Sequence, residues 1–248
     1  MTLSAFFQAN PKAALGLSGG VDSAYLLYAA HACGADVQPY FVKPAFQPAF
    51  ELEDARRLCA QLGVSLCVIE VDILSCAAVT ENTPARCYHC KRQIFSALAA
   101  QAAHDGYYLL LDGTNASDDA ADRAGMRALR ELSVRSPLRE CGLDKSTIRQ
   151  LSRQAGLFTH DKPAYACLAT RVPTGEPITA ALLRATEEAE SFLFSLGLRD
   201  LRVRVFHGAA RIQVPRDALE TVLAQRETII DTLKKHYSAV LLDLEVRG

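Results

Sequence analysis

The first half of the chain alternates short, continuous apolar runs with segments of helical length. The apolar runs have the length of strands and cover Ala13–Ser18, Val37–Val42, Ser65–Val71 and Tyr107–Asp112. Such runs are typical of strands buried on both faces of a sheet. Helix-period segments lie between them, at Val21–Cys33, Pro48–Leu62 and Lys91–His104. Because each segment is long enough for a crossover, the order predicts an α/β fold whose parallel sheet carries helices on both faces.

The pattern changes after Thr159, where "THDKPAYACLATRVPTGEP" contains three prolines and little periodicity. A loop of this length is often functional. Beyond it we expect a helix capped by Thr179, the strands "LRVRVF" and "ARIQVP", a helix over Asp217–Lys235 and the strand "SAVLLDLEV". This order predicts a small α+β domain. The chain is thus expected to divide into residues 1–160, a loop over 161–177 and a second domain over 178–248.

Composition narrows the partners that the chain can have. Half of its 248 residues are hydrophobic, enough for a sizeable core, and its 27 basic and 28 acidic residues nearly cancel. No global field therefore draws it to nucleic acid or to an anionic membrane. The amino terminus resembles no secretion signal, and no apolar run approaches the ~18 residues of a membrane span. We expect a cytoplasmic protein that binds neither membrane nor nucleic acid.

The hexapeptide "SGGVDS", Ser18 to Ser23, separates the first predicted strand from the first predicted helix, a common ligand position in parallel sheets. Gly19 and Gly20 let backbone amides approach an anion, and the two serines can donate hydroxyl hydrogen bonds. The lysine of a P-loop is absent, which favours holding pyrophosphate over transferring a γ-phosphoryl group. Asp22 is a candidate to bind Mg²⁺. The alternative is a plain glycine turn with an Asp/Ser helix cap.

A second polar segment, "DGTNASD", follows the strand predicted at Tyr107–Asp112 and so lies at the same sheet edge. Gly113 allows a tight exit from the strand. Thr114, Asn115 and Asp118 are candidates to contact nucleotide, metal or substrate. An ordinary Asx-rich helix start explains the same residues, so both interpretations stay open.

Eight cysteines in a chain without a secretion signal are expected to be thiols or metal ligands. Cys87 and Cys90 form a CxxC pair directly before the helix predicted at Lys91, and Cys167 lies in the proline-rich loop. If the fold returns this loop over the nucleotide edge, three thiolates can hold a [4Fe-4S] cluster and leave one iron open. The alternatives are a zinc site completed by His89 and three unrelated thiols.

These motifs resemble a superfamily and, within it, one family. "SGGVDS" looks like the signature of the PP-loop ATP pyrophosphatases, which cut ATP between its α and β phosphates. The segments "RCYHCK", "DGTNASD", "VRSPL", "DKPAYACLATR" and "GEPIT" follow one another as in the LarE family of ATP-dependent sulfur transferases. The resemblance implies a PP-loop ATP pyrophosphatase domain over 1–160. It also implies that residues 178–248 bind substrate and support a homo-oligomer.

LarE enzymes act on a pyridinium dicarboxylate mononucleotide on the way to the nickel-pincer nucleotide cofactor of lactate racemase. The resemblance implies that ATP adenylylates each carboxylate, sulfur attacks and AMP leaves. In one version of the family the sulfur comes from a cysteine at the position of Cys167, which becomes dehydroalanine. In the other, three cysteines hold a [4Fe-4S] cluster that carries a sulfide. Cys87 and Cys90 favour the cluster version and leave the source of the sulfide open.

Such a substrate needs cations for its phosphate and its second carboxylate. Arg202 and Arg204 alternate on one face of the predicted strand "LRVRVF", with Arg211 on the neighbouring strand. By resemblance, Glu190 on the preceding helix helps to position them. A solvated basic strand face is the alternative. Arg171, just after the cysteine loop, is a further candidate for a phosphate contact.

Other functions fit part of this pattern. A tRNA thiolase of the PP-loop superfamily combines ATP with three cysteines, but it calls for a broad basic surface that the near-neutral charge does not suggest. An amidotransferase needs an ammonia-supplying domain for which the chain has no room. A non-catalytic nucleotide sensor or sulfur-storage protein keeps the same motifs without turnover.

Overall fold

The structure is a computed structural model that describes residues 1–118 and 123–247. The chain forms two compact units, residues 1–73 with 85–162 and residues 74–84 with 163–248. The second unit thus includes residues 74–84, which the sequence pattern assigns to the first domain. This segment belongs there because the Asn82 side-chain amide donates to the backbone oxygens of Pro173 (2.8 Å) and Glu176 (3.0 Å). The Ile178 backbone N–H also donates to the oxygen of Thr80 (2.8 Å).

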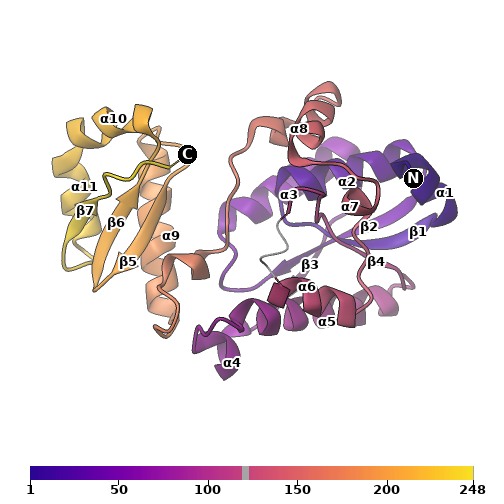
Figure 1. Cartoon of the computed structure of the whole chain (residues 1–248), viewed down its shortest axis with the longest axis horizontal. Coiled ribbons are helices and arrows are strands. Elements are labelled where there is room, and N and C mark those ends of the chain that lie inside the picture. The colour runs from indigo at the N-terminus through magenta and orange to yellow at the C-terminus, as the bar shows by residue number, and fades with distance from the viewer. Residues whose placement is uncertain (119–122, 248) are drawn as a thin grey trace. The chain divides into compact units, whose positions relative to one another are not determined.

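The described part of the first unit contains a four-stranded parallel sheet with the order β3-β2-β1-β4 (Figure 1). Its strands are β1 (Lys12–Gly16), β2 (Asp36–Lys43), β3 (Cys67–Glu70) and β4 (Leu110–Leu111). The predicted parallel α/β fold is confirmed. β4 is shorter than its apolar run, because the backbone N–H of Tyr107 bonds the oxygen of Ala102 in the preceding helix (2.7 Å).

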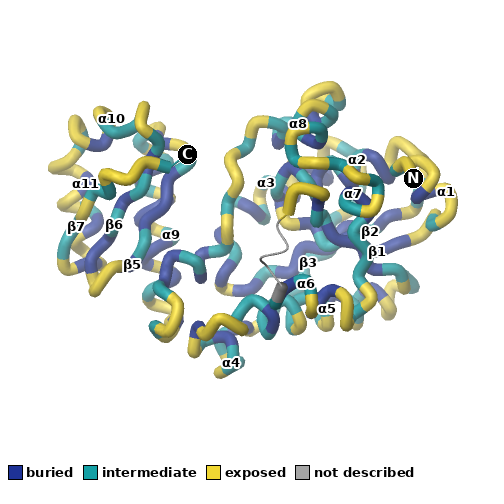
Figure 2. The backbone as a smooth tube through the Cα atoms, viewed as in Figure 1, coloured by how far each residue is buried: buried dark blue, intermediate teal, exposed yellow. Residues whose placement is uncertain are grey.

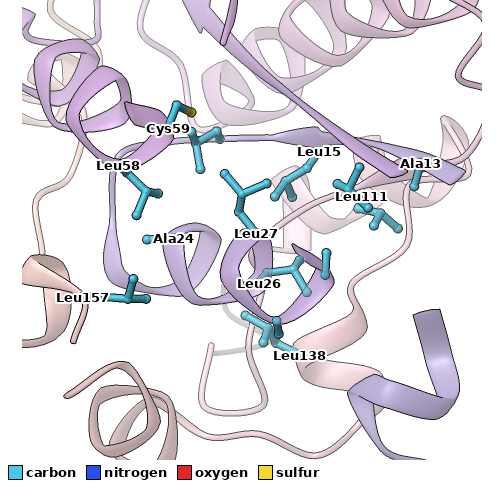
Figure 3. Close-up of a cluster of buried hydrophobic side chains, with 14 of the residues drawn as sticks. Ala13, Leu15, Ala24, Leu26, Leu27, Leu58, Cys59, Leu111, Leu138 and Leu157 are labelled. Atoms are coloured by element: carbon cyan, nitrogen blue, oxygen red, sulfur yellow. The ribbon is translucent and has the colours of Figure 1, made fainter. Parts of the chain in front are cut away.

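Helices cover both faces of this sheet. The helices of this unit are α1 (Leu3–Ala9), α2 (Val21–Ala32), α3 (Ala49–Leu62), α5 (Arg86–His104), α6 (Arg123–Glu131), α7 (Pro137–Glu140) and α8 (Lys145–Gln154), with the short 3-10 turn η2 (Phe158–Asp161). A further 3-10 turn, η1 (Ile73–Ser75), begins at the last residue of this unit's first segment and continues into the segment 74–84. On one face, Leu15 of β1 packs in a cluster with Leu27 of α2 and Leu58 of α3 (Figure 3). On the other face, Leu98 of α5 packs with Ala14 and Tyr40. Figure 2 shows the buried central strands between helices with exposed outer sides.

The helix α5 begins at Arg86, five residues before the predicted Lys91, so the sequence prediction of a CxxC pair in front of the helix is wrong. Cys87 and Cys90 instead lie in its first two turns, as its second and fifth residues. The intervening tyrosine and histidine are only moderately weak helix formers, and nothing between Pro84 and Lys91 breaks a helix. Residues at i and i+3 share one helix face, so the two thiols lie on the same side.

The second unit combines a small sheet with helices. Its elements are α4 (Ala77–Thr80), η3 (Leu168–Arg171), α9 (Ala180–Ser195), β5 (Arg202–Phe206), β6 (Ala209–Gln213), η4 (Arg216–Ala218), α10 (Leu219–Ala224), α11 (Arg226–Leu233) and β7 (Val240–Leu242). β6 pairs antiparallel with β5 and parallel with β7. The Thr179 hydroxyl accepts from the N–H of Leu182 (3.2 Å) and caps α9 as predicted. The single helix predicted over Asp217–Lys235 is interrupted at Gln225, whose φ of −102° and ψ of 14° leave the helical region.

None of the helices in the described ranges has the length and apolar character that crossing a membrane requires.

Candidate active site

The phosphate loop, Ser18 to Ser23, follows β1 and enters α2. Gly19 has a φ of +77°, and a Cβ at this position would lie 2.5 Å from the backbone oxygen of Glu51. Only glycine fits such a position. Gly20 is the N-cap residue of α2 and offers no side chain to close the helix terminus. The loop therefore presents the backbone of a helix start to a bound anion.

The two serines of the phosphate loop bond each other. The Ser23 hydroxyl accepts from the backbone N–H of Ser18 (3.1 Å), and the two hydroxyl oxygens lie 3.0 Å apart. A Cβ on Gly113 would lie 2.8 Å from the backbone nitrogen of Ser23. The start of "DGTNASD" is thus packed directly against the phosphate loop, and Gly113 is required by this close approach.

Asp22 carries the negative charge of the phosphate loop. Its Oδ2 accepts from the Lys145 ammonium at the start of α8 (2.5 Å). Its Oδ1 is buried and has no hydrogen-bond partner among the described residues. An unpaired buried carboxylate oxygen is costly unless a ligand completes it, and a divalent cation is the ligand that hard oxygens prefer. Lys145 had no motif to mark it in the sequence.

The segment after β4 is organised mainly by its own side chains. Asp112 accepts from the hydroxyls of Thr114 and Ser136, the latter at 2.6 Å. Burial raises the pKa of Asp112, although these hydrogen bonds oppose the rise. Asn115 Oδ1 accepts from the N–H groups of Ser117 and Asp118 as in an Asx turn, while its buried Nδ2 has no partner in the described residues. Thr114 is therefore engaged within the segment, and Asn115 retains a donor.

The CxxC turn of α5 lies in the first unit and Cys167 in the second. All eight cysteines of the chain are thiols, and Cys87, Cys90 and Cys167 are half-buried. Tyr88 lies between the two cysteines in sequence. Its hydroxyl donates to Glu131 (2.7 Å), and the Arg127 guanidinium lies 3.8 Å from the centre of its ring. Within each unit, the described residues include no group of three or more His, Cys, Asp or Glu side chains placed to hold a metal ion.

Cys167 is the N-cap residue of η3, and its backbone oxygen accepts from both the N–H and the hydroxyl of Thr170. Arg171, at the end of η3, is 1% exposed and lies against Glu190, which is also 1% exposed. Its Nε and Nη2 donate to the two Glu190 carboxylate oxygens at 2.7 and 3.1 Å. Burial lowers the pKa of Arg171, but Glu190 more than offsets this and raises it overall. Arg171 therefore holds the cysteine loop on α9, and its Nε and Nη2 are engaged by Glu190.

Glu190 organises the loop through further contacts. Its Oε1 also accepts from the backbone N–H of Val203 in β5 (2.8 Å), and its Oε2 accepts from the Tyr165 hydroxyl. Burial and the Glu190 charge raise the pKa of that tyrosine. The centre of the Tyr165 ring lies 4.6 Å from the Arg171 guanidinium carbon and 4.8 Å from that of Arg202. This arginine cluster, composed of Tyr165, Arg171, Glu190, Arg202 and Arg204, joins the cysteine loop to α9 and β5.

The two strand arginines also reach the cysteine loop. Arg202 is only 4% exposed and donates to the backbone oxygen of Ala164, so it is not part of a solvated face. Burial, with the charges of Arg171 and Arg247, lowers the pKa of Arg202 to about 10. Arg204 donates to the oxygen of Thr170 (2.7 Å). Both side chains thus bind the loop on either side of Cys167.

A pocket of about 360 Å³ opens beside this cluster within the second unit. Its lining includes the three arginines Arg171, Arg204 and Arg211 together with Glu176 and His207. The Arg211 Nε is buried and makes no hydrogen bond to the described residues. It forms an ion pair with the Oδ2 of Asp243, 3.5 Å away. The Nε and Nη1 of Arg204 already donate to Gln213 and to the backbone oxygen of Thr170. The donors that remain for a ligand in this pocket therefore come mainly from Arg211. Such a site can accept an anionic group.

Comparisons with known proteins give the chain a family. No family model matches it. It is 35% identical to an uncharacterised protein of Synechocystis over 88% of this chain and 82% of the relative. It is 30% identical to the pyridinium-3,5-bisthiocarboxylic acid mononucleotide synthase of Lactiplantibacillus plantarum, over 98% of this chain and 89% of the synthase. A weaker similarity, 26% over 62% of this chain, links it to the tRNA-specific 2-thiouridylase MnmA of Clostridium acetobutylicum.

The similarity to the synthase extends over both units, and the phosphate loop has the glycine geometry and the acidic residue that a PP-loop enzyme needs. The chain therefore belongs to the LarE family of ATP-dependent sulfur transferases, within the PP-loop ATP pyrophosphatase superfamily.

Proposed function

We propose that this enzyme converts pyridinium-3,5-biscarboxylic acid mononucleotide into its bisthiocarboxylic acid, as a step toward the nickel-pincer nucleotide cofactor of lactate racemase. The observation that carries the proposal is the similarity, across 98% of the chain, to a synthase named for that product. The phosphate loop supplies independent support, since it suits pyrophosphate better than a transferred γ-phosphoryl group.

The proposed reaction has two steps for each carboxylate. A substrate carboxylate oxygen attacks the α-phosphorus of ATP, the bond to the β-phosphate oxygen breaks, and pyrophosphate leaves. A sulfur nucleophile then attacks the carbonyl carbon, and AMP leaves with the former carboxylate oxygen. The first step removes the charge that repels nucleophiles, and the second uses AMP as a stable leaving group. Phosphate-loop amides stabilise the charge that develops on the pyrophosphate.

Mg²⁺ fits the phosphate loop. The buried, unpaired Oδ1 of Asp22 is a hard oxygen ligand of the kind that this ion prefers. When bound, Mg²⁺ would neutralise phosphate charge during adenylylation. Lys145 keeps the carboxylate oriented through its other oxygen.

The thiols also fit the proposed [4Fe-4S] cluster by their chemistry. Cys87 and Cys90 present two half-buried thiols from one helix face, and Cys167 presents a third from the second unit. When bound by these three residues, the cluster would supply a reactive sulfide at its open iron. The alternative sulfur donor is Cys167 itself. After its thiolate displaces AMP, a base would take the Cα proton and the Cβ–S bond would break, which leaves the sulfur on the product and dehydroalanine in the chain.

The substrate's anionic groups have a candidate position in the second unit. The pocket beside the arginine cluster offers the Arg211 guanidinium and the edge of Arg204 to a carboxylate or phosphate. Arg202 and Glu190 have the geometry of positioning residues, because they hold the loop that carries Cys167. In this proposal Arg211 and Arg204 contact the substrate, whereas Arg202 and Glu190 act only by holding the loop in place.

The second unit also supports the proposed homo-oligomer. Its described residues include exposed large apolar side chains, among them Leu223, Leu241 and Leu244, which are 55%, 39% and 86% exposed. Surface of this kind is typical of assembly interfaces when it is contiguous. Light scattering on the purified protein tests the assembly state.

The decisive experiment is anaerobic purification with iron and sulfide analysis, followed by incubation with the mononucleotide, ATP and Mg²⁺. Iron with sulfide, and more than one thiocarboxylate per chain, support the cluster. A protein without iron that loses the mass of sulfur from Cys167 supports sacrifice. Zinc without iron contradicts the cluster. The Cys87→Ser and Cys90→Ser variants should lose iron, whereas Cys141→Ser, outside these motifs, is the matched control.

The competing function is tRNA thiolation, which the similarity to MnmA favours. Pyrophosphate release that depends on tRNA and not on the mononucleotide would establish it. A protein that binds ATP without turnover under either condition would instead be a nucleotide sensor.

A further inference from the structure

Lys162 is the last residue of the first unit, directly before Pro163, at which the second unit resumes. Its ammonium donates to the backbone oxygen of Gly19 in the phosphate loop (2.9 Å) and to the Asp54 carboxylate on α3. Its side chain is 15% exposed. A lysine 143 residues away in sequence is thus in direct contact with the phosphate loop.

The backbone around Lys162 is fixed as firmly as its side chain. Arg149 of α8 donates through Nη2 to the oxygen of Lys162 and through Nη1 to the oxygen of His160, both at 2.7 Å. The ammonium also lies 5.1 Å from the centre of the Phe50 ring. Because the main chain and the ammonium are held separately, the charge at the phosphate loop is preorganised rather than mobile.

Charge and donor number indicate what this lysine can bind. "SGGVDS" contains no basic residue and adds the negative charge of Asp22 beside the incoming phosphates. A lysine ammonium has three N–H donors, of which Gly19 and Asp54 accept two. One donor is left for a phosphate oxygen, and the Gly19 carbonyl keeps the ammonium at the phosphate loop while it binds.

We propose that Lys162 is the phosphate-binding cation that the phosphate loop lacks in its own sequence, and that it binds the β- and γ-phosphates of ATP and then the released pyrophosphate. The inference rests on the proposed use of ATP and names a binding residue for that site.

The simplest rival is an ion pair between Lys162 and Asp54 that only stabilises the fold. The two explanations differ in what Asp54→Asn does. This variant removes the carboxylate partner and leaves the cation, so a phosphate-binding lysine keeps its role. A purely structural pair loses as much from Asp54→Asn as from Lys162→Met.

The test measures the affinities of the full-length protein for Mg·ATP, Mg·pyrophosphate and AMP by calorimetry, without mononucleotide or sulfur donor. We expect Lys162→Met to weaken ATP and pyrophosphate binding by about 10- to 100-fold, the value of one charge-assisted hydrogen bond. AMP binding should change by less than about twofold, since AMP has no β- or γ-phosphate. Lys162→Arg should retain part of the affinity, and Asp54→Asn nearly all of it.

The double variant Lys162→Met/Asp54→Asn guards against unfolding, because it leaves no unpaired charge at the site. It should fold with the wild-type circular dichroism spectrum and still bind ATP weakly. Equal losses for ATP and AMP, or equal losses in Asp54→Asn and Lys162→Met, would overturn the inference. If ATP binding depends on Lys162 but no thiocarboxylate forms from the mononucleotide, the proposed substrate is wrong and the phosphate-binding role stands.

Discussion

In the arginine cluster of the second unit, the buried Arg171 guanidinium meets both carboxylate oxygens of Glu190. At the phosphate loop of the first unit, one oxygen of Asp22 bonds Lys145 and the other is buried without a partner among the described residues. The first arrangement is complete in the protein alone. The second is complete only with a ligand.

This difference separates charges that hold the structure from charges that bind substrate. A buried ion pair with all its hydrogen bonds made gives little to an incoming ligand, because any new contact must break an existing one. A buried carboxylate oxygen without a partner carries a desolvation cost that a bound cation relieves. Each of the following predictions tests one side of this comparison.

The largest effect should come from Glu190→Gln. The substitution leaves the Arg171 charge buried beside a neutral amide, which costs about 3–5 kcal/mol of unfolding free energy. Urea unfolding of the purified protein measures it. Glu188→Gln on the same helix is the matched control: Glu188 is 52% exposed and pairs with His236, so its loss should cost under about 1 kcal/mol. Similar small losses in both variants would mean that the cluster is not a structural support.

Asp22→Asn tests the other region. Here the main loss should be in adenylylation, about 100-fold in turnover, because the amide cannot hold Mg²⁺ as a carboxylate does. Release of pyrophosphate over a titration of Mg²⁺ measures it. Unfolding free energy should change by less than about 1 kcal/mol, since the pair with Lys145 is partly exposed. A large stability loss with normal Mg²⁺ dependence would place Asp22 among the structural charges.

The third prediction contrasts the two glycines of the phosphate loop. Gly19→Ala should lose about 1–3 kcal/mol of stability, because its Cβ would overlap the Glu51 backbone oxygen, and should lose ATP binding with it. Gly20 has a φ of −86°, and a Cβ there would meet only the Ser18 hydroxyl, at 3.4 Å. Gly20→Ala should therefore change the unfolding free energy by less than about 1 kcal/mol. Thermal unfolding and ATP calorimetry on both variants decide the matter. Equal behaviour of the two would show that the loop moves to relieve the overlap.

Much of the fold could be predicted because its signals are local. The apolar runs that became β1 and β2 are largely buried at the centre of the sheet, whereas β3 is an edge strand whose residues are half-buried or exposed. Thr179 marks a helix start by its own hydrogen bond. The start of α5 was mispredicted because the residues of the CxxC pair carry no strong helical preference. The place of residues 74–84 in the second unit depends on Asn82, whose partners lie 91 and 94 residues away. No local pattern encodes such a contact.

The residues of the candidate site likewise divide into those with a local sequence signal and those placed by long-range contacts. "SGGVDS" and Gly113 were identified because glycines at a strand exit have a local backbone reason. Lys145 and Lys162 were not, since they reach the phosphate loop across 123 and 143 residues. Lys145 lies in no motif, and "DKPAYACLATR", which contains Lys162, was noted for its cysteine and not for this lysine. Arg171 is a candidate for a phosphate contact by its charge, but charge alone does not reveal that Glu190 already pairs with it.

The smallest expected effect is on the stability given by two helix caps, one in each unit. Thr179→Ala removes the hydroxyl that caps α9 and should cost about 1 kcal/mol at every pH, because a hydroxyl does not titrate in this range. Asp144 caps α8 as a carboxylate. Hydrogen bonds from the backbone and side chain of Thr147 and from Ser146 lower the pKa of Asp144 below its ordinary value of 3.8. An acid whose folded pKa is lowered contributes stability above the unfolded pKa and loses it as the pH falls through the folded one. Asp144→Asn keeps a capping oxygen without this titration, so its difference from the wild type should shrink in urea unfolding below pH 3.8. A difference that grows on acidification would contradict the charged cap.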